Sequence, residues 1–198
     1  LSSIEAIDFS AHQSGTLNVY LSSAMLSQSG NGTLTIVSGA GGIDTLKAAS
    51  SLTGQVYVAG VGHVWLDGTT NNTVRISSGA TVDVHGGGGS DTIHASTTGS
   101  LLDGGAGRDM LFAGAGTDLV AFGAGYGADQ VSGFNAAQDR ISLSGTNIQY
   151  MSEILARTTD TAAGASIDLG NGDVLTLAGV TRTSLSAANF NGITAGAP

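Results

Sequence analysis

Short runs of alternating apolar and polar residues, separated by Gly, Ser and Asn, dominate the first 85 residues. β-branched side chains are common in these runs, and the side chains of a strand point alternately to its two faces. We therefore predict strands at residues 17–21, 33–37, 55–58, 74–76 and 81–84. Apolar residues fall at helical spacing only within residues 150–157, so the chain is predicted to be nearly all β.

A nine-residue pattern rich in Gly and Asp occupies the middle of the chain. It occurs at Gly86–His94, Gly104–Phe112 and Ala113–Ala121, where the third copy begins with Ala in place of Gly. Each copy fits the repeat G-G-x-G-x-D-x-U-x, in which U is a large apolar residue. Glycines permit a tight turn over the first six positions, and the last three form a short strand that buries residue U. Two such units would make one coil of a solenoid.

The repeat block has recognisable ends. A degenerate copy lies at Gly39–Lys47, but Asp44 in it has no clear stacked partner, so a ligand role and a plain turn role both stay open. Residues 122–131 read as a repeat lengthened by two residues, and glycines become rarer beyond it. We predict a β-rich, solenoid-like segment at 1–85, a nonapeptide roll at 86–133 and a C-terminal β cap at 134–198.

Asp91 and Asp109 are 18 residues apart, which is the length of one coil, so they should lie one above the other. With the two-residue insertion, Asp129 continues the same column. Carboxylates one strand spacing apart, about 4.8 Å, would repel each other unless a cation lay between them. Calcium suits this position because it takes six to eight oxygen ligands, including the carbonyls of Gly-rich turns.

Asp118 belongs to the opposite side of the roll. The turn before it on that side, residues 95–100, has no carboxylate. A site there would use Asp118 with the following coil, near Asn135 or Asp139. In all we expect about two to four calcium ions.

Composition narrows the classes of partner. The chain has 15 Asp and Glu against 6 Lys and Arg, a net charge of -9, without the clustered basic residues that nucleic acid requires. It has 32 Gly, 1 Pro and no Cys, so thiolate metal sites and disulfides are excluded. No apolar run approaches the roughly 18 residues of a membrane span. His63, His85 and His94 share no metal-ligand spacing.

The repeats resemble those of the RTX, or repeats-in-toxin, family of type I secreted bacterial proteins. In that family one turn offers carbonyls from its second and fourth positions, and the facing turn from its first and third. The resemblance implies one calcium site formed by Gly87, Gly89, Asp91, Gly104, Ala106 and Asp109. Gly105 and Gly107 would serve the next site, and Asp118 would act with Gly114 and Gly116. Residues 167–180 and 184–190 are similar to the family's C-terminal capping segment.

The fold implied is a parallel β-roll, or β-solenoid, with calcium bound in Gly-Asp turns. The resemblance implies a non-catalytic module of an extracellular protein, secreted or held at the cell surface, that folds on extracellular calcium and supports export. Any catalytic domain would lie outside this chain.

Three alternatives stay open beside this reading. One is a calcium-free, Gly-rich solenoid in which Asp merely forms turns. Another is a surface-layer or adhesion protein that self-associates or binds cell-surface polysaccharide. The last is an enzyme such as a polysaccharide lyase or an epimerase, with its site in residues 1–85, or an accessory domain of a secreted polysaccharide-modifying enzyme. Lys and Arg are scattered without pattern, which argues against a catalytic site within the chain.

Overall fold

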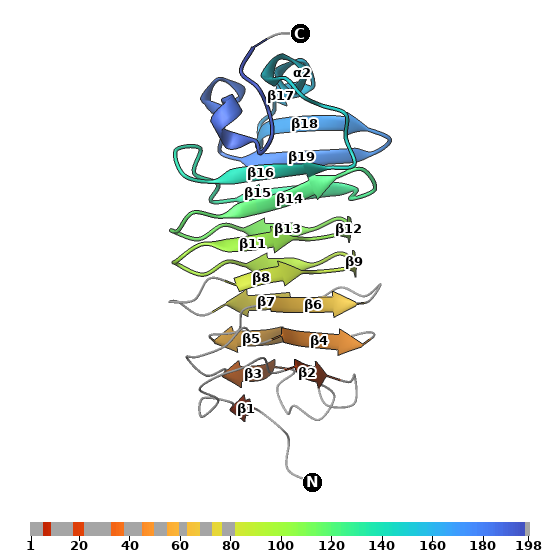
Figure 1. The fold of residues 1–198 in the computed structure, drawn as a ribbon, viewed down its shortest axis with the longest axis vertical. Helices are drawn as coiled ribbons and strands as arrows, with labels where there is room; N and C mark the ends of the chain where they lie inside the picture. Colours follow the sequence, from red (N-terminus) through yellow and green to blue (C-terminus); the bar gives the residue numbers. More distant parts are fainter. Residues whose placement is uncertain are drawn as a thin grey trace.

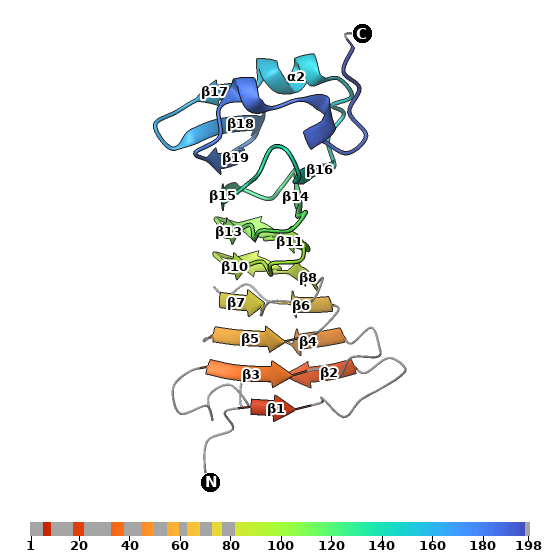
Figure 2. The same ribbon diagram turned by 90° about the vertical axis from the view of Figure 1, so that its left-hand side faces the viewer.

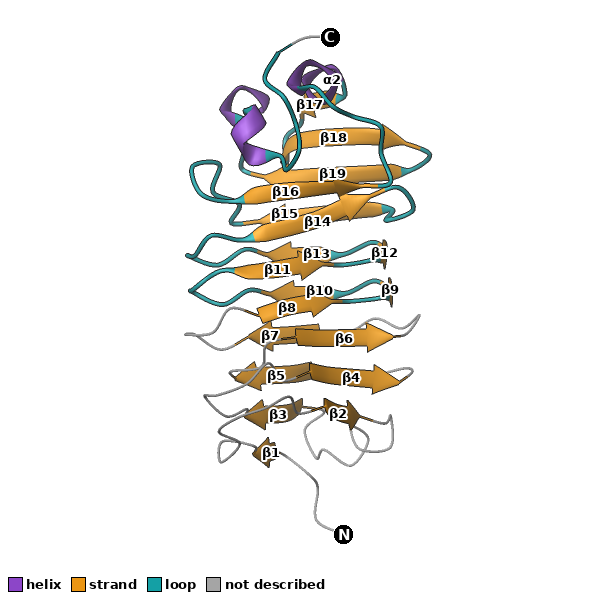
Figure 3. Cartoon of the chain, viewed as in Figure 1, coloured by secondary structure: helices purple, strands orange, loops and turns teal. Residues whose placement is uncertain are grey.

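The computed structural model describes the strands within residues 6–76 and the continuous segment 82–196. Two long sheets form the two walls of a parallel β-solenoid (Figure 1). Turned by 90°, the walls stand side by side along the whole stack (Figure 2). The chain is nearly all β (Figure 3), as the sequence predicts.

The first sheet contains ten strands. In spatial order they are β1 (Ala6–Asp8), β3 (Thr33–Val37), β5 (Gln55–Ala59), β7 (Thr73–Ile76), β10 (Thr92–His94), β13 (Met110–Phe112), β15 (Ala128–Ser132), β19 (Asp173–Ala178), β18 (Gly164–Gly170) and β17 (Thr158–Asp160). The pairs from β1 to β19 are parallel, and those among β17, β18 and β19 are antiparallel.

The second sheet contains seven strands, and all of its pairs are parallel. In spatial order they are β16 (Arg140–Ser144), β14 (Leu119–Gly123), β11 (Ser100–Asp103), β8 (Val82–His85), β6 (His63–Asp67), β4 (Thr45–Ala49) and β2 (Asn18–Leu21). A short pair, β9 (Gly88–Gly89) with β12 (Ala106–Gly107), lies in the turns. Because β7 pairs with β10 and β8 with β11, both long sheets continue across residue 85.

The five strands predicted in the first 85 residues all form, with ends that differ by at most one residue from β2, β3, β5, β7 and β8. The strands β1, β4 and β6 were not predicted. Asp44 lies outside the described residues.

The core is a narrow double row of aliphatic side chains inside the two walls. Successive coils contribute one residue each, aligned by the strand register. The rows contain Val74, Ile93, Leu111, Val131 and Leu177 on one wall and Val64, Val84, Leu102, Val120 and Ile141 on the other, each at most 1% exposed. The apolar U positions of the repeat therefore face inward, as predicted. Burying one such side chain contributes about 1.5–3 kcal/mol.

A cap closes the C-terminal end of the stack (Figure 1). It contains the antiparallel strands β17 to β19, the helix α2 (Met151–Ala156), where the apolar residues have helical spacing, and two 3₁₀ turns, η1 (Arg182–Ser184) and η2 (Ala187–Asn189). No helix in the described part of the chain is long and apolar enough to cross a membrane.

Candidate metal centre

One edge of the roll carries three stacked turns, residues 86–91, 104–109 and 123–129, which we call the first turn column. Asp91 and Asp109 directly precede β10 and β13, Asp129 is the second residue of β15, and these three strands pair in register. The N–H of Asp91 donates to Oδ1 of Asp109 at 2.7 Å, and the N–H of Asp109 donates to Oδ1 of Asp129 at 2.9 Å. The structure thus places the three aspartates one above another.

These carboxylates are buried but only half satisfied. Asp109 is 1% exposed and Asp129 is 2% exposed, yet Oδ2 of each has no hydrogen-bond partner. Burial raises the pKa of Asp109 to about 6, against the hydrogen bond from Asp91, with a further rise from the charge of Asp103. Burial likewise raises the pKa of Asp129 to about 8, with further rises from nearby carboxylates. A cation would remove the cost of leaving these oxygens bare.

Glycine is required in this column because successive turns touch through their backbones. A Cβ on Gly107, where φ is 155°, would collide with the carbonyl of Gly89. A Cβ on Gly105 would meet the carbonyl of Gly87 in the same way, and that carbonyl also accepts the N–H of Ala106 at 2.8 Å. Gly104 lies against the carboxylate of Asp109. Of the predicted turn ligands, Gly104 and Gly107 lie against Asp109, whereas Gly105 and Ala106 contact the backbone of Gly87.

The opposite edge carries the second turn column, residues 95–100, 113–118 and 133–139. The N–H of Asp118 donates to Oδ1 of Asp139 at 2.9 Å, so the structure brings these two residues together. Oδ2 of Asp118 accepts the N–H of Gly114 at 2.7 Å, whereas its Oδ1 is buried without a partner. Burial raises the pKa of Asp118, opposed by the Gly114 hydrogen bond. A Cβ on Gly116 would meet the backbone of Thr98 and Gly99.

The atoms that could bind a metal ion in both columns are carboxylate and carbonyl oxygens. Among residues 82–196 and the strands before them, no group of three or more His, Cys, Asp or Glu side chains could hold a metal ion. A bound ion would therefore depend on backbone carbonyls as well as on pairs of aspartates. An oxygen-only ligand set of this kind suits calcium rather than zinc.

A comparison with protein families agrees with this chemistry. The model of the RTX calcium-binding nonapeptide repeat, in four copies, matches residues 85–120 and residues 98–129. Residues 85–129 are RTX calcium-binding repeats. No curated protein matches the chain. The matched residues contain all three turns of the first turn column. They also contain the 113–118 turn of the second turn column, which ends at Asp118.

Two further aspartates, one within the RTX repeats and one in the C-terminal cap, were missed in the sequence. Asp103 directly precedes the second Gly-Gly pair, and its Oδ2 lies 2.7 Å from Nδ1 of His85. Its Oδ1 is buried without a hydrogen-bond partner. The signal that could have found it is the 18-residue spacing from His85, which places both residues at the last repeat position. Asp103 adds negative charge beside Asp109 and Asp129.

The second missed residue is Asp173, at the start of β19. Its Oδ2 accepts the N–H of Gly125 at 2.9 Å, and its Oδ1 accepts the N–H of Gly127 at 2.8 Å. These two hydrogen bonds lower the pKa of Asp173. No repeat spacing links Asp173 to the turn that it holds.

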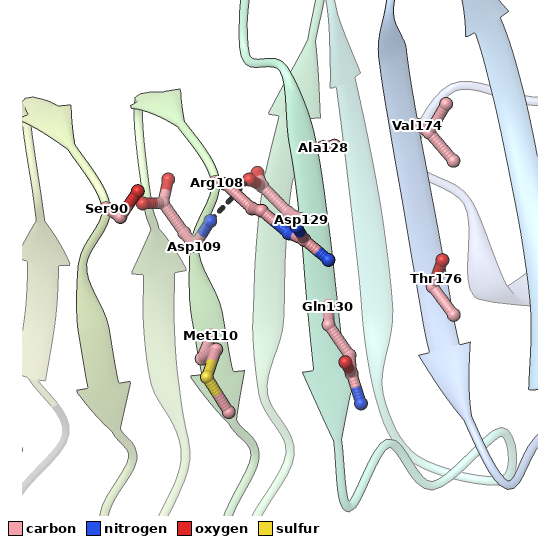
Figure 4. A pocket seen from close by; sticks show the side chains of 9 residues that line it. All are labelled: Ser90, Arg108, Asp109, Met110, Ala128, Asp129, Gln130, Val174 and Thr176. Atoms are coloured by element: carbon pink, nitrogen blue, oxygen red, sulfur yellow. Dashed lines mark hydrogen bonds between the residues drawn. The ribbon is translucent and has the colours of Figure 1, made fainter. Parts of the chain in front are cut away.

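A surface cavity of about 330 Å³ lies beside the first turn column. Figure 4 shows Asp109, Asp129 and Arg108 on its wall, with the hydrogen bond between the two aspartates drawn. The cavity gives solvent a route close to the stacked aspartates.

Proposed function

We propose that this chain is a calcium-dependent roll module of a secreted or cell-surface bacterial protein. In this proposal the module folds fully on meeting extracellular calcium, and it supports the export and the stability of the protein that carries it. The observation that supports it best is the pair of buried, half-satisfied carboxylates at Asp109 and Asp129. We assign no catalytic role to the chain.

Calcium binding and folding are linked through the carboxylates of the first column. Without a cation, each carboxyl of the first column must either hold a proton or carry a charge in a poorly solvated place near other carboxylates, so the turns are held together weakly. A cation that binds only the folded roll stabilises it by RT ln(1 + [Ca]/Kd), which is about 2.7 kcal/mol per site at a hundredfold excess over Kd. Low cytosolic calcium would then favour a loose chain, and millimolar extracellular calcium a folded one.

The test is a calcium titration followed by far-UV circular dichroism and by calorimetry. Asp109→Asn removes one carboxylate charge from the first column. Asp168→Asn is the matched control, because Asp168 is exposed in the cap and its Oδ1 accepts only the nearby Gly170 N–H, at 2.8 Å. We expect a cooperative gain of β signal in the wild type and the control, and a shift to higher calcium in Asp109→Asn. No change up to about 10 mM calcium, well above the affinities of extracellular modules, would contradict the proposal.

A second candidate function is calcium-dependent self-association or adhesion. The outer face of the first sheet exposes Met110, at 46%, beside a stacked pair of rings, His94 and Phe112, whose centroids lie 4.3 Å apart. Exposed apolar surface on a stiff sheet is a common contact feature. Sedimentation of the wild type and of Met110→Ser, with and without calcium, tests it: calcium-dependent oligomers that the substitution weakens support it, and a monomer throughout rules it out.

A further inference from the structure

The aspartates at the C-terminal ends of the two columns are satisfied to different degrees. Asp129 and Asp139 are both buried, at 2% and 0% exposure. Asp129 accepts one N–H and keeps Oδ2 bare. Asp139 accepts the N–H of Asp118 on Oδ1, at 2.9 Å, and the N–H of Asn135 on Oδ2, at 2.7 Å. One residue type at two similar positions is therefore half-satisfied in one column and fully occupied in the other.

The carbonyls beside Asp139 are occupied as well. Asn189, which is fully buried in η2, donates from Nδ2 to the carbonyl of Ala136 at 2.7 Å and to that of Asp139 at 3.3 Å. These carbonyls belong to the 133–139 turn, where a calcium ion would seek ligands. The C-terminal cap thus satisfies these two carbonyls with a side-chain amide, where a bound cation would otherwise do so.

Asp173 closes the first column in a similar way. It lies level with Gly127, because Ala128 pairs with Val174 in the parallel register of β15 and β19. Each of its oxygens accepts one N–H from the lengthened turn, from Gly125 and from Gly127. Within the same turn, the carbonyl of Tyr126 accepts the N–H of Gly107 at 2.7 Å. Three hydrogen bonds therefore connect this turn to Asp173 and to Gly107.

A carboxylate surrounded by N–H groups is a poor place for a cation. The positive ends of the N–H dipoles point at the oxygens, and they would face the ion directly. A calcium ion also needs six to eight oxygens, whereas here both the carboxylate oxygens and the adjacent carbonyls already have donors. By contrast, Asp109, Asp118 and Asp129 each have a buried carboxylate oxygen without a hydrogen-bond partner, and such an oxygen favours a cation.

We propose that Asp139 and Asp173 are metal-free end caps of the two turn columns, and that calcium is confined to the turns that present bare oxygens on Asp109, Asp118 and Asp129. This inference rests on the proposed function for the calcium that the other turns bind. For Asp139 it replaces the ligand role predicted from the sequence. The C-terminal ends of the two turn columns are then held by hydrogen bonds and not by a bound ion.

Three isosteric variants of the full chain test the inference: Asp129→Asn, Asp139→Asn and Asp173→Asn. Bound calcium is counted by isothermal titration calorimetry, and Tm is measured in excess chelator and in saturating calcium. We expect Asp129→Asn to lose one calcium or to bind it at least tenfold more weakly. Its Tm in chelator should not fall, because Asn can still accept the Asp109 N–H and carries no charge that burial would penalise.

The two cap variants should behave in the reverse manner. Each places an amide NH₂ against a backbone N–H, so each should lower Tm by the same amount in chelator and in calcium while leaving the calcium titration unchanged. Loss of a calcium ion in Asp139→Asn or Asp173→Asn, or a Tm deficit seen only with calcium, would overturn the inference. A wild type that binds no calcium would instead overturn the proposed function, and the Tm values in chelator would still decide whether the caps hold.

Discussion

The clearest quantitative consequence of the first column is that calcium must displace protons. With pKa values of about 8 for Asp129 and about 6 for Asp109, the apo roll at pH 7 holds roughly 0.9 proton on the first carboxyl and roughly 0.1 on the second. At pH 6 these occupancies become roughly 1.0 and 0.5. Calcium takes carboxylates in the ionised form, so binding releases about one proton at pH 7 and about 1.5 at pH 6.

The slope of the logarithm of affinity against pH equals the number of protons released. Lowering the pH from 7 to 6 should therefore weaken calcium binding at this site roughly 15- to 20-fold. Two carboxyls with ordinary pKa values near 4 would show almost no change over the same interval.

Isothermal titration calorimetry measures this release. Titrations at pH 7 in buffers of different ionisation enthalpy give the number of protons from the slope of the apparent enthalpy. We expect about one for the wild type and a value near 0.1 for Asp129→Asn, which lacks the more basic carboxyl. An affinity that is constant from pH 7 to pH 6, with no buffer dependence, would refute the buried and half-satisfied state of these aspartates.

Three further outcomes are expected. In chelator the raised pKa values of Asp109 and Asp129 mean that the folded state holds protons which the unfolded chain has lost, so the stability that these two carboxyls contribute is full below about pH 4 and falls as the pH rises to about 8. Urea unfolding between pH 5 and pH 8 checks the sign, and stability that rises with pH over this range would contradict it. Gly107→Ala should cost about 1–3 kcal/mol by urea unfolding, because its Cβ meets the Gly89 carbonyl at positive φ, whereas Gly125→Ala, with open space around it, should cost less. Leu102→Ala should cost about 2–5 kcal/mol in the same assay because it empties a fully buried core position, whereas a similar loss in the exposed control Met110→Ala would argue against the register.

The parts of the fold that repeat were predictable from the sequence. The 18-residue spacing determines the register of the coils, and the pairing of Ile93 with Leu111 and the stacking of Asp91 on Asp109 follow from it. Apolar alternation located strands outside the repeats as well, since β3 has the predicted ends. These predictions succeeded because a solenoid contacts mainly its own neighbouring coils, so local periodicity carries the three-dimensional information.

The parts that depend on distant or unspecified positions were not predictable. Asp173 holds Gly125 across 48 residues, and no period relates them. The 18-residue spacing places Asp103 level with His85, but the repeat pattern leaves this last position free, so the hydrogen bond between the two side chains needs the structure. The occupation of Asp139 by two N–H groups depends on the exact path of the 133–139 turn, which spacing alone does not reveal. The antiparallel pairing of β18 with β19 likewise lies outside the repeat.

The most direct test of the whole account is the number of calcium ions that each chain binds. Equilibrium dialysis against millimolar calcium, followed by elemental analysis of the protein, gives this number without any assumption about folding. The account predicts about two to four ions per chain, reduced by Asp109→Asn and unchanged by Asp168→Asn. A chain that retains no calcium under these conditions would contradict calcium binding and leave a Gly-rich solenoid in which the aspartates only form turns.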